Sequence, residues 1–327
     1  MLFASIDIGS NAARLLLANV FDSTQEPSTA SHVTFVRVPL RLGEDVFHDG
    51  MISEPRIANL VKTLKAYKLL IDVYEPMDFD ICATAAMREA SNREDIIKRV
   101  CKETGLTIRV IDGQEEATII RESNNLVGSN AQLATTGVQD AGLNSQLALL
   151  PTLMYIDVGG GSTEISILHD NNFVTSRSFN VGTIRMLQEK NADELTEHWN
   201  GMLRWVEEST MPFQKIACVG SGGNINKLVK LYGNKTTSRI TLKELNDGYN
   251  KLNKLSVRER MEKFKMRPDR ADVIVPAAKI FSHIMQAANI DSVLAPKLGL
   301  VDGLIYELSQ KHLASNHIGA TQNRLKS

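Results

Sequence analysis

The stretch SIDIGSNAARLLL, residues 5–17, decides the fold of the N-terminal part of the chain. Apolar runs of strand length stand on either side of Gly9 and a few small residues, which is typical of a β-hairpin. A closely similar stretch, MYIDVGGGSTEISIL, occupies residues 154–168. In each stretch an aspartate, Asp7 or Asp157, stands two residues before the first glycine of the turn. Two such hairpins predict a duplicated α/β domain whose halves face each other across a cleft.

Helical and strand patterns alternate between the two hairpins, which also favours an α/β fold. Residues 53–74 carry apolar side chains at helical spacing after a Ser53 cap. Residues 79–90, FDICATAAMREA, predict a buried strand that enters a loop. The sequence then predicts a helix closed by Gly105, a strand over 106–112, and a turn that brings two carboxylates to the start of another helix.

The segment 124–150 has the composition of a connection between domains, because it is rich in Gly, Ser, Asn, Thr and Gln and only weakly periodic. We therefore predict an N-terminal domain over 1–123 and a C-terminal domain over 124–313. The last predicted helix, about 299–313, is free to pack back on the first domain. We expect a frayed tail over 314–327.

Composition excludes several classes of protein. The 327 residues are 43% hydrophobic and 23% charged, which is ordinary for a globular chain, and the formal net charge is only −1. The chain as a whole is therefore not a nucleic-acid wrapper. Cys82, Cys101 and Cys218 include no CxxC pair, which favours reduced thiols. No apolar run reaches the length of a membrane helix, so we expect no membrane partner and a cytoplasmic location.

Three glycine-containing loops follow apolar strands, at residues 9–12, 159–163 and 220–224. Consecutive amide groups in such loops can point at one spot and bind phosphate oxygens. A single loop of this kind is more often an ordinary turn, but three loops, two of them preceded by an aspartate, favour phosphate binding. The candidate phosphate-binding residues are Gly9, Ser10, Asn11, Gly159, Gly160, Gly161, Ser162, Gly222 and Gly223.

Asp7 and Asp157 end their strands at two of these loops. Mg²⁺ in proteins is usually held by one or two carboxylates together with water and substrate oxygens, so both aspartates are candidate magnesium ligands. The alternative is that each aspartate only caps the amides of its turn.

The chain resembles the family of exopolyphosphatases and guanosine pentaphosphate phosphohydrolases, within the superfamily of actin, sugar kinases and Hsp70. The residues that carry the resemblance are SIDIGSNAARLLL from Ser5, VRVPLRLGEDV with Arg41 and Gly43, CATAAMREA with Arg88, IDGQEEA, IDVGGGSTE, VGSGGN, RADVI from Arg270, and LVDGLIYE. The resemblance runs nearly end to end. It implies two ribonuclease H-like domains facing a central cleft, in a short form that lacks the C-terminal helical region of longer relatives.

The resemblance also implies roles for residues. Glu116, the second glutamate of the EEA motif, would be catalytic, and Arg88 would clamp two phosphate oxygens with its forked guanidinium. Asp157 and Glu164 would bind Mg²⁺; a potassium activator is left open. From the residues alone, Glu115 and Glu116 are equally explained as carboxylates that complement a helix start. Glu115 is expected to face outward, and its neighbouring charge would raise the pKa of Glu116.

Two positions depart from the family pattern. Ala12 stands where relatives usually carry a hydroxyl residue, so we expect weaker phosphate binding at the first loop without loss of activity. Asn224 stands where a threonine is usual in the third loop, which would change how a nucleotide or distal phosphate sits.

Residues 227–270 form a basic segment, with 13 Lys/Arg against 5 Asp/Glu and therefore a local net charge of +8. Such a segment favours a polyanion such as polyphosphate, although ordinary solvated helix faces explain it equally well. Aromatic residues are sparse there, which disfavours stacking on single-stranded nucleic acid. Arg267 and Arg270 are the candidate phosphate contacts, and Arg270 could instead form a structural ion pair with Asp272.

The preferred function is therefore Mg²⁺-dependent hydrolysis of the terminal phosphoryl group of inorganic polyphosphate by in-line attack of water. The alternatives are hydrolysis of guanosine pentaphosphate, a sensor that binds polyphosphate or nucleotide without chemistry, and a small-molecule kinase of the same superfamily. The EEA and TAAMREA motifs argue against a kinase. A homodimer is left open.

Overall fold

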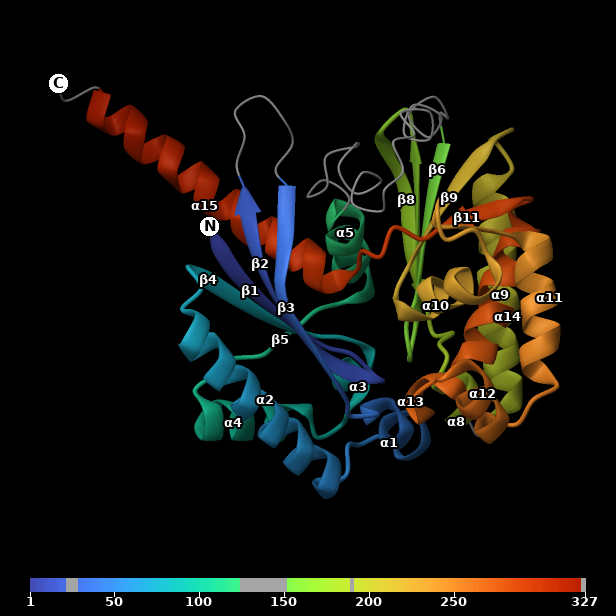
Figure 1. Ribbon diagram of the computed structural model, residues 1–327, viewed down its shortest axis with the longest axis horizontal. Coiled ribbons are helices and arrows are strands. Elements are labelled where there is room, and N and C mark those ends of the chain that lie inside the picture. The colour runs from blue at the N-terminus through green and yellow to red at the C-terminus, as the bar shows by residue number, and fades with distance from the viewer. Residues whose placement is uncertain (22–28, 124–151, 189–190, 325–327) are drawn as a thin grey trace.

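The structure, a computed structural model, describes residues 1–21, 29–123, 152–188 and 191–324, with side chains described as far as Ala314 and Ser315 onward given as backbone only. The predicted inter-domain connection, 124–150, lies outside the described residues. Two mixed sheets stand side by side, one in each half of the chain, with helices packed around them (Figure 1).

The first sheet has five strands in the order β3-β2-β1-β4-β5. They are β1 (Leu2–Ile8), β2 (Ala12–Phe21), β3 (Thr29–Pro39), β4 (Asp78–Ala83) and β5 (Arg109–Val110). The predicted hairpin is confirmed, since β1 and β2 pair antiparallel across the first glycine loop. β3 continues the antiparallel ladder, whereas β4 lies parallel to β1 and β5 parallel to β4.

The second sheet has six strands in the order β10-β11-β9-β6-β7-β8. They are β6 (Thr152–Val158), β7 (Thr163–His169), β8 (Asn172–Phe179), β9 (Ile216–Ser221), β10 (Arg239–Thr241) and β11 (Ser292–Leu294). β6, β7 and β8 form an antiparallel ladder, while β9 pairs parallel with β6 and β11 parallel with β9. From β8 to β11 the strands therefore repeat the order and directions of the first sheet. This confirms the predicted duplication and the ribonuclease H-like fold of the actin superfamily.

Helices of the N-terminal half are α1 (Leu42–Asp49), α2 (Glu54–Tyr74), α3 (Ala85–Glu89), α4 (Arg93–Thr104) and α5 (Gly113–Glu122). Those that follow are α8 (Arg185–Gln188), α9 (Ala192–Thr210), α10 (Gly223–Tyr232), α11 (Leu242–Asn253), α12 (Val257–Phe264), α13 (Pro268–Ala271), α14 (Ile274–Ala287) and α15 (Leu300–Arg324). Gly105 ends α4 in the left-handed conformation, as predicted. Ser53 stands at the N-cap of α2 without a side-chain capping hydrogen bond.

Two local predictions differ from the structure. The segment after β4 is not a loop but the short helix α3, which carries Arg88. The strand predicted over 106–112 is reduced to Arg109 and Val110, which pair with Cys82 and Ala83 at the end of β4. Asp112 then leaves the sheet to cap α5.

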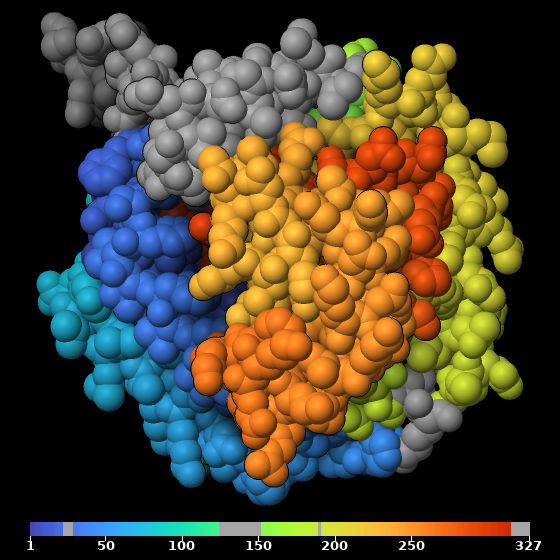
Figure 2. Space-filling view, turned by 45° about the vertical axis from the view of Figure 1, so that its right-hand side comes forward, coloured from blue at the N-terminus to red at the C-terminus, as the bar shows by residue number. Residues whose placement is uncertain are grey.

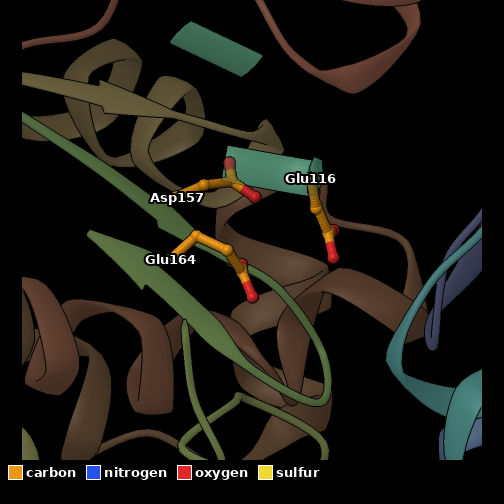
Figure 3. A group of neighbouring side chains, drawn as sticks. All are labelled: Glu116, Asp157 and Glu164. Atoms are coloured by element: carbon orange, nitrogen blue, oxygen red, sulfur yellow. The ribbon is translucent and has the colours of Figure 1, made fainter. Parts of the chain in front are cut away.

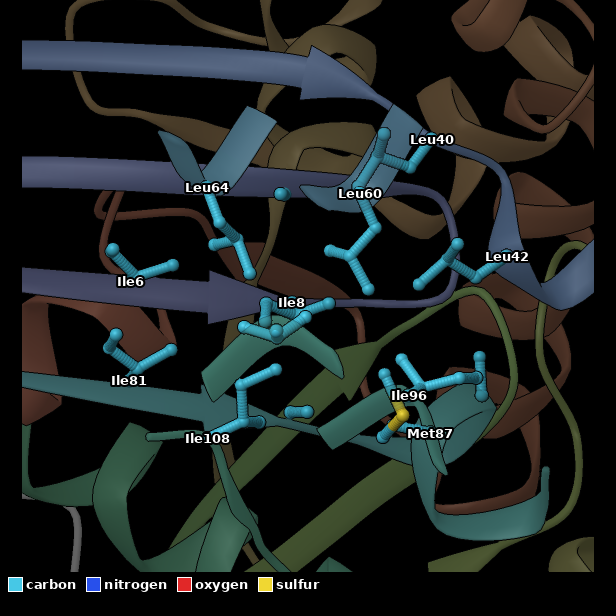
Figure 4. Close-up of a cluster of buried hydrophobic side chains, with 14 of the residues drawn as sticks. Ile6, Ile8, Leu40, Leu42, Leu60, Leu64, Ile81, Met87, Ile96 and Ile108 are labelled. Carbon is cyan, nitrogen blue, oxygen red and sulfur yellow. The ribbon is translucent and has the colours of Figure 1, made fainter. Parts of the chain in front are cut away.

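Each sheet has its own hydrophobic core. In the first half, strand residues such as Ile6 and Ile8 pack against Leu60 and Leu64 of α2 (Figure 4). A separate cluster in the second half packs β6, β7 and β9 against α10, α11 and α14. A fully buried Leu or Ile side chain contributes about 1.5–3 kcal/mol to stability, so each core can hold its loops at fixed strand ends.

Helix α15 returns to the N-terminal half. Ile305 and Leu308 pack with Phe3 of β1, and Leu304 packs with Ile119 of α5 on another side. The helix continues to Arg324, past Ala314, where the sequence predicted a frayed tail. The domain boundary at 123/124 borders undescribed residues and stays a prediction. No described helix is both long and apolar enough to cross a membrane.

Candidate active site

A cleft of about 740 Å³ lies between the two halves. In Figure 2 the blue N-terminal half and the orange part of the C-terminal half meet along a hollow. The three predicted loops all reach this cleft. Among the predicted site residues, those that line it are Asp7, Gly9, Ser10, Asn11, Glu116, Asp157, Gly159, Gly160, Gly161, Ser162, Gly222, Gly223 and Arg270.

Asp157 and Glu164 lie directly opposite one another in the antiparallel pair of β6 and β7. Side chains at opposed positions emerge on the same face of a sheet, so the two carboxylates are neighbours although the glycine loop separates them in sequence. Like charges at such positions repel each other. Ser221 at the end of β9 donates a hydrogen bond to Asp157, and Ser178 Oγ of β8 donates one to Glu164 Oε1 at 2.8 Å.

Glu116 joins these two carboxylates from the first turn of α5. The helix begins where Asp112 caps it, since the Asp112 carboxylate accepts hydrogen bonds from the amides of Gln114 and Glu115. Glu116 is 7% exposed and Glu164 2%. One carboxylate oxygen from each of Glu116, Asp157 and Glu164 lies within 4.8 Å of the other two (Figure 3).

The negative charge of these carboxylates is only partly balanced by cationic side chains of the described residues. Glu116 Oε2 and Glu164 Oε2 are buried and accept no hydrogen bond from any described residue. Burial, followed by the charges of Glu164 and Asp157, raises the pKa of Glu116 well above its ordinary value. Burial and Asp157 raise the pKa of Glu164 to about 7. The cluster therefore has the donor set and the electrostatic need for a divalent cation.

Arg88 lies beside this cluster. Its Nη1 is 3.8 Å from Glu116 Oε2, and the same nitrogen donates a hydrogen bond to the Ile111 carbonyl at 2.9 Å. The structure thus brings the predicted arginine and the predicted catalytic glutamate together, although Arg88 is not among the residues lining the cleft.

Glu115 faces outward, as predicted, and forms an ion pair with Arg109. Our expectation that Glu115 would raise the pKa of Glu116 is wrong. The helix turns the two side chains apart. The charges of Glu164, Asp157 and Asp7 raise the pKa of Glu116, while that of Arg88 lowers it.

The second glycine loop is held by backbone hydrogen bonds. The Gly159 carbonyl accepts from the Thr183 amide at 3.0 Å, and the Gly160 carbonyl accepts from the amides of Ile184 and Arg185. In a trans peptide the carbonyl and the next amide point in opposite directions. The amides of Gly160 and Gly161 therefore point away from residues 183–185, which leaves them available to an anion.

The first and second loops touch. A Cβ placed on Gly160 would lie 2.9 Å from Ser10 Cβ, and one on Gly161 would lie 3.0 Å from Ser10 Oγ. Only glycine allows this approach, so both loops can contact a single phosphoryl group.

Asp7 differs from Asp157 in its surroundings. It forms an ion pair with Arg14, which lies opposite it on β2. Asp7 therefore has a countercharge within the chain, and its proposed part in metal binding stays a prediction.

The two predicted basic contacts, Arg267 and Arg270, lie in different surroundings. Arg270 donates a hydrogen bond to Asn224 Oδ1 at 2.6 Å and lies over Gly223, where a Cβ would come within 2.5 Å of its Nη2. The Arg270–Asp272 ion pair weighed above is wrong, because Asp272 pairs with Arg41 of the N-terminal half at 2.5 Å. Arg267 is more than half exposed and does not line the cleft.

Several cleft residues were missed by sequence reasoning. Lys227, Lys230 and Lys235 of the basic segment line the cleft, as do Arg14 and Arg37. Aligning the two hairpins would have found Arg14, since it follows Asp7 by the same spacing that separates Glu164 from Asp157. No motif in the sequence marks Ser178 as a site residue.

The two departures from the family pattern differ in position. Ala12 is fully buried and is not among the residues lining the cleft, whereas Asn224 lines it and holds Arg270.

Paired actin-like domains with glycine loops and a buried carboxylate cluster between them define a phosphate-handling protein of that superfamily. The chain belongs to the Ppx/GppA phosphatase family, whose model matches residues 23–123 and 139–312.

Relatives with similar sequences carry phosphatase names. Exopolyphosphatase 2 of Mycobacterium tuberculosis is 25% identical over 332 residues, which cover 94% of this chain and 98% of that protein. A bifunctional 3-dehydroquinate synthase/phosphatase of Fusobacterium nucleatum is 26% identical over 324 residues. The match covers 93% of this chain but only 46% of that relative, so the chain spans about half of its length.

Solved structures agree on the fold. The Aquifex aeolicus member of the family has a TM-score of 0.67 at 25% identity, covering 95% of this chain and 98% of that one. An exopolyphosphatase from Cytophaga hutchinsonii has a TM-score of 0.76 at 20% identity, covering 94% and 97%.

Proposed function

We propose that this chain is a Mg²⁺-dependent exopolyphosphatase that hydrolyses the terminal phosphoryl group of inorganic polyphosphate. The observation that carries the proposal is the group of three carboxylates beside two touching glycine loops: Glu116 and Glu164 are buried, and Asp157 is half-buried. Relatives named exopolyphosphatase that match over almost their full length support the choice of substrate.

The carboxylates fit a magnesium ion. Two of their oxygens are buried without a hydrogen-bond partner in the described part of the chain, and hard carboxylate oxygens are the ligands that Mg²⁺ prefers. Asp157 and Glu164 would hold the ion, with Glu116 close by. When bound, Mg²⁺ would neutralise charge on the phosphate oxygens.

The chain itself supplies the remaining contacts to phosphate. The amides of Gly160 and Gly161, with those of the first loop, would bind oxygens of the terminal group, and Arg88 would neutralise charge that develops on it. Lys227, Lys230 and Arg270 also line the cleft and would supply cations for the following phosphates of the chain. We leave Arg267 as a contact only for a substrate that extends past the cleft.

Glu116 would orient the attacking water. The water oxygen bonds to the terminal phosphorus, the bond from phosphorus to the bridging oxygen breaks, and Glu116 accepts the water proton. A raised pKa suits this role, because a carboxylate whose pKa lies nearer to neutral is a better proton acceptor. The shortened polyphosphate leaves with the bridging oxygen.

Guanosine pentaphosphate is the second candidate substrate. The cleft, of about 740 Å³, is also lined by His32, Phe35 and Lys235, which would leave room for more than a phosphate chain. Binding of either compound without hydrolysis would support the alternative that the protein is a sensor of polyphosphate or nucleotide.

The test is phosphate release with Mg²⁺ from long-chain polyphosphate and from guanosine pentaphosphate in parallel. Glu116→Gln is expected to lower kcat at least 10²-fold, and Glu115→Gln, the adjacent exposed carboxylate, is the matched control that keeps activity. Release from the nucleotide alone would make the chain an alarmone phosphatase. Absence of release from both, with intact binding, would reject hydrolysis.

A further inference from the structure

Arg185 is a buried arginine at the place where the two halves meet. It begins α8, just after the segment that holds the second glycine loop, and is only 6% exposed. A buried guanidinium is costly unless its donors are satisfied, so its partners indicate what it stabilises.

One partner is the second glycine loop. Arg185 Nε donates a hydrogen bond to the Gly161 carbonyl at 2.8 Å. The backbone amides of residues 183–185 donate to the carbonyls of Gly159 and Gly160, and the Arg185 side chain donates to the next carbonyl, that of Gly161. Because the peptide is trans, fixing the Gly161 carbonyl turns the Ser162 amide in the opposite direction. Ser162 lines the cleft, so Arg185 extends the row of anion-binding amides by one.

Another partner is the helix that carries Arg88. Arg185 Nη2 lies 2.6 Å and 2.7 Å from the two carboxylate oxygens of Glu89. Glu89 and Arg88 are consecutive residues of the five-residue helix α3. A contact that fixes Glu89 therefore also fixes the backbone from which the Arg88 side chain extends.

Phe47 of α1 also packs against Arg185. The guanidinium carbon lies 4.2 Å from the centre of the Phe47 ring. The same ring packs on the loop, since a Cβ on Gly161 would lie 2.4 Å from Phe47 Cζ. One arginine thus contacts the loop of the C-terminal half and both α1 and α3 of the N-terminal half.

We propose that Arg185 is a positioning residue that locks the Gly161–Ser162 peptide and the Arg88 helix into one geometry, so that the Ser162 amide and the Arg88 guanidinium meet the same phosphoryl group. This role rests on the proposed function, because it assumes that both groups bind phosphate. It acts through Gly161 and Glu89 and needs no contact between Arg185 and the substrate.

Arg185→Lys tests the role, because lysine keeps the charge but cannot bond the Gly161 carbonyl and both Glu89 oxygens in the same planar arrangement. We expect kcat/KM for polyphosphate to fall about 10–100-fold, as displacements of about 1 Å produce, in protein that remains folded by circular dichroism. Arg177→Lys is the matched control. Arg177 is an exposed arginine of β8 that stacks on Phe179, and its variant should keep wild-type kinetics.

A double-mutant cycle with Glu89→Gln tests whether Arg185 acts through α3. If it does, the single variants and the double variant lose activity to a similar extent, because each breaks the same linkage. Independent, multiplicative losses would overturn the linkage between Arg185 and Arg88.

Binding of inorganic phosphate, measured by calorimetry, gives a readout that does not require turnover. We expect Arg185→Lys to weaken phosphate binding about tenfold and to leave Mg²⁺ affinity within twofold of wild type, because the side chains that bond to the carboxylate cluster, Ser178 and Ser221, come from β8 and β9. Unchanged phosphate affinity would overturn the proposal. If wild-type protein hydrolyses no substrate, the proposed function fails, whereas a selective loss of phosphate binding would still support the positioning role.

Discussion

Arg14 and Glu164 occupy equivalent places in the two halves of the molecule. Each lies directly across its hairpin from the aspartate that ends the preceding strand, Asp7 in the first half and Asp157 in the second. In the first half the opposed pair is an ion pair, whereas in the second it is two neighbouring carboxylates. In the first half Arg14 balances the charge of Asp7. In the second half the charges of Asp157 and Glu164 call for a bound cation.

Glu164→Gln should stabilise the metal-free protein. The pKa of Glu164 is raised from 4.5 to about 7 by burial and Asp157, so between these values the folded state holds a proton that the unfolded state has released. Stability of metal-free wild type must then fall as pH rises from about 4.5 to 7. At pH 8 with chelator we expect the variant to melt a few degrees higher, since about 1 kcal/mol shifts Tm by roughly 2–4 °C in domains of 150–250 residues.

Excess Mg²⁺ should reverse this order, because wild type gains binding energy that the variant loses. Glu197→Gln on the exposed face of α9 serves as the control and should melt like wild type in both buffers. A variant less stable than wild type with chelator at pH 8 would mean that the carboxylates do not repel each other.

Ser178→Ala should weaken metal binding. The Ser178 hydroxyl is the hydrogen-bond donor to Glu164 Oε1, and loss of such supporting bonds typically lowers metal affinity about 10–100-fold. The Mg²⁺ concentration for half-maximal phosphate release measures the effect. Ser176→Ala, two residues earlier on β8, should leave that concentration unchanged; equal shifts in both variants would point to the strand rather than to Glu164.

Gly113→Ala should displace α5. A Cβ at Gly113 would lie 2.2 Å from Ser178 Cβ and 2.4 Å from its Oγ, so the helix that carries Glu116 must move away from β8. We expect loss of stability of about 1–3 kcal/mol and a much larger fractional loss of kcat. Chemical denaturation and phosphate release measure the two effects.

Gly201→Ala is the opposite case within a helix. Gly201 lies on the exposed side of α9, and nothing stands within 4 Å of an added Cβ. The substitution should stabilise the protein by about 0.5–1 kcal/mol and leave the rate unchanged. If Gly113→Ala behaved in the same way, the contact between α5 and β8 would not control Glu116.

Phosphate binding should change the angle between the halves. Arg41 and Asp272 link them by an ion pair, and Asn11 donates a hydrogen bond to the Asp269 carbonyl at 3.0 Å. We expect small-angle scattering to give a smaller radius of gyration with Mg²⁺ and phosphate than without, because closure excludes water from the cleft. Asp272→Asn should enlarge the ligand-free form. Superimposable free and product-bound structures would contradict this prediction.

Much of the fold follows from local sequence. The alternation of apolar residues around the turns at Gly9 and Gly159 predicts both hairpins, and the repeated Asp-x-Gly pattern predicts the duplication. Gly105 ends its helix as expected, since only glycine adopts that conformation without strain. These features depend on residues close in sequence, so periodicity and turn chemistry are sufficient to predict them.

Side-chain contacts between residues distant in sequence could not be predicted from periodicity and turn chemistry. The sequence offered Asp272 as the partner of Arg270, two residues away, whereas folding pairs Asp272 with Arg41 and turns Arg270 toward Asn224. Ser178 and Arg185 look like ordinary polar residues until β8 and α8 place them against Glu164 and Glu89.

By itself, then, the sequence determined the strand-and-loop frame and the residue types at its loops, because backbone conformation responds to nearby side chains. Only the tertiary structure decided which of the acidic residues share one desolvated space. Glu116 comes from α5 and Asp157 and Glu164 from β6 and β7. Burial is the first cause of all three raised pKa values; repulsion from within the cluster adds to it for Glu116 and Glu164, and the charge of Asp7 adds to it for Asp157. The β6–β7 pairing sets the distance between Asp157 and Glu164, but Glu116 joins them only after α5 packs against β7 and β8.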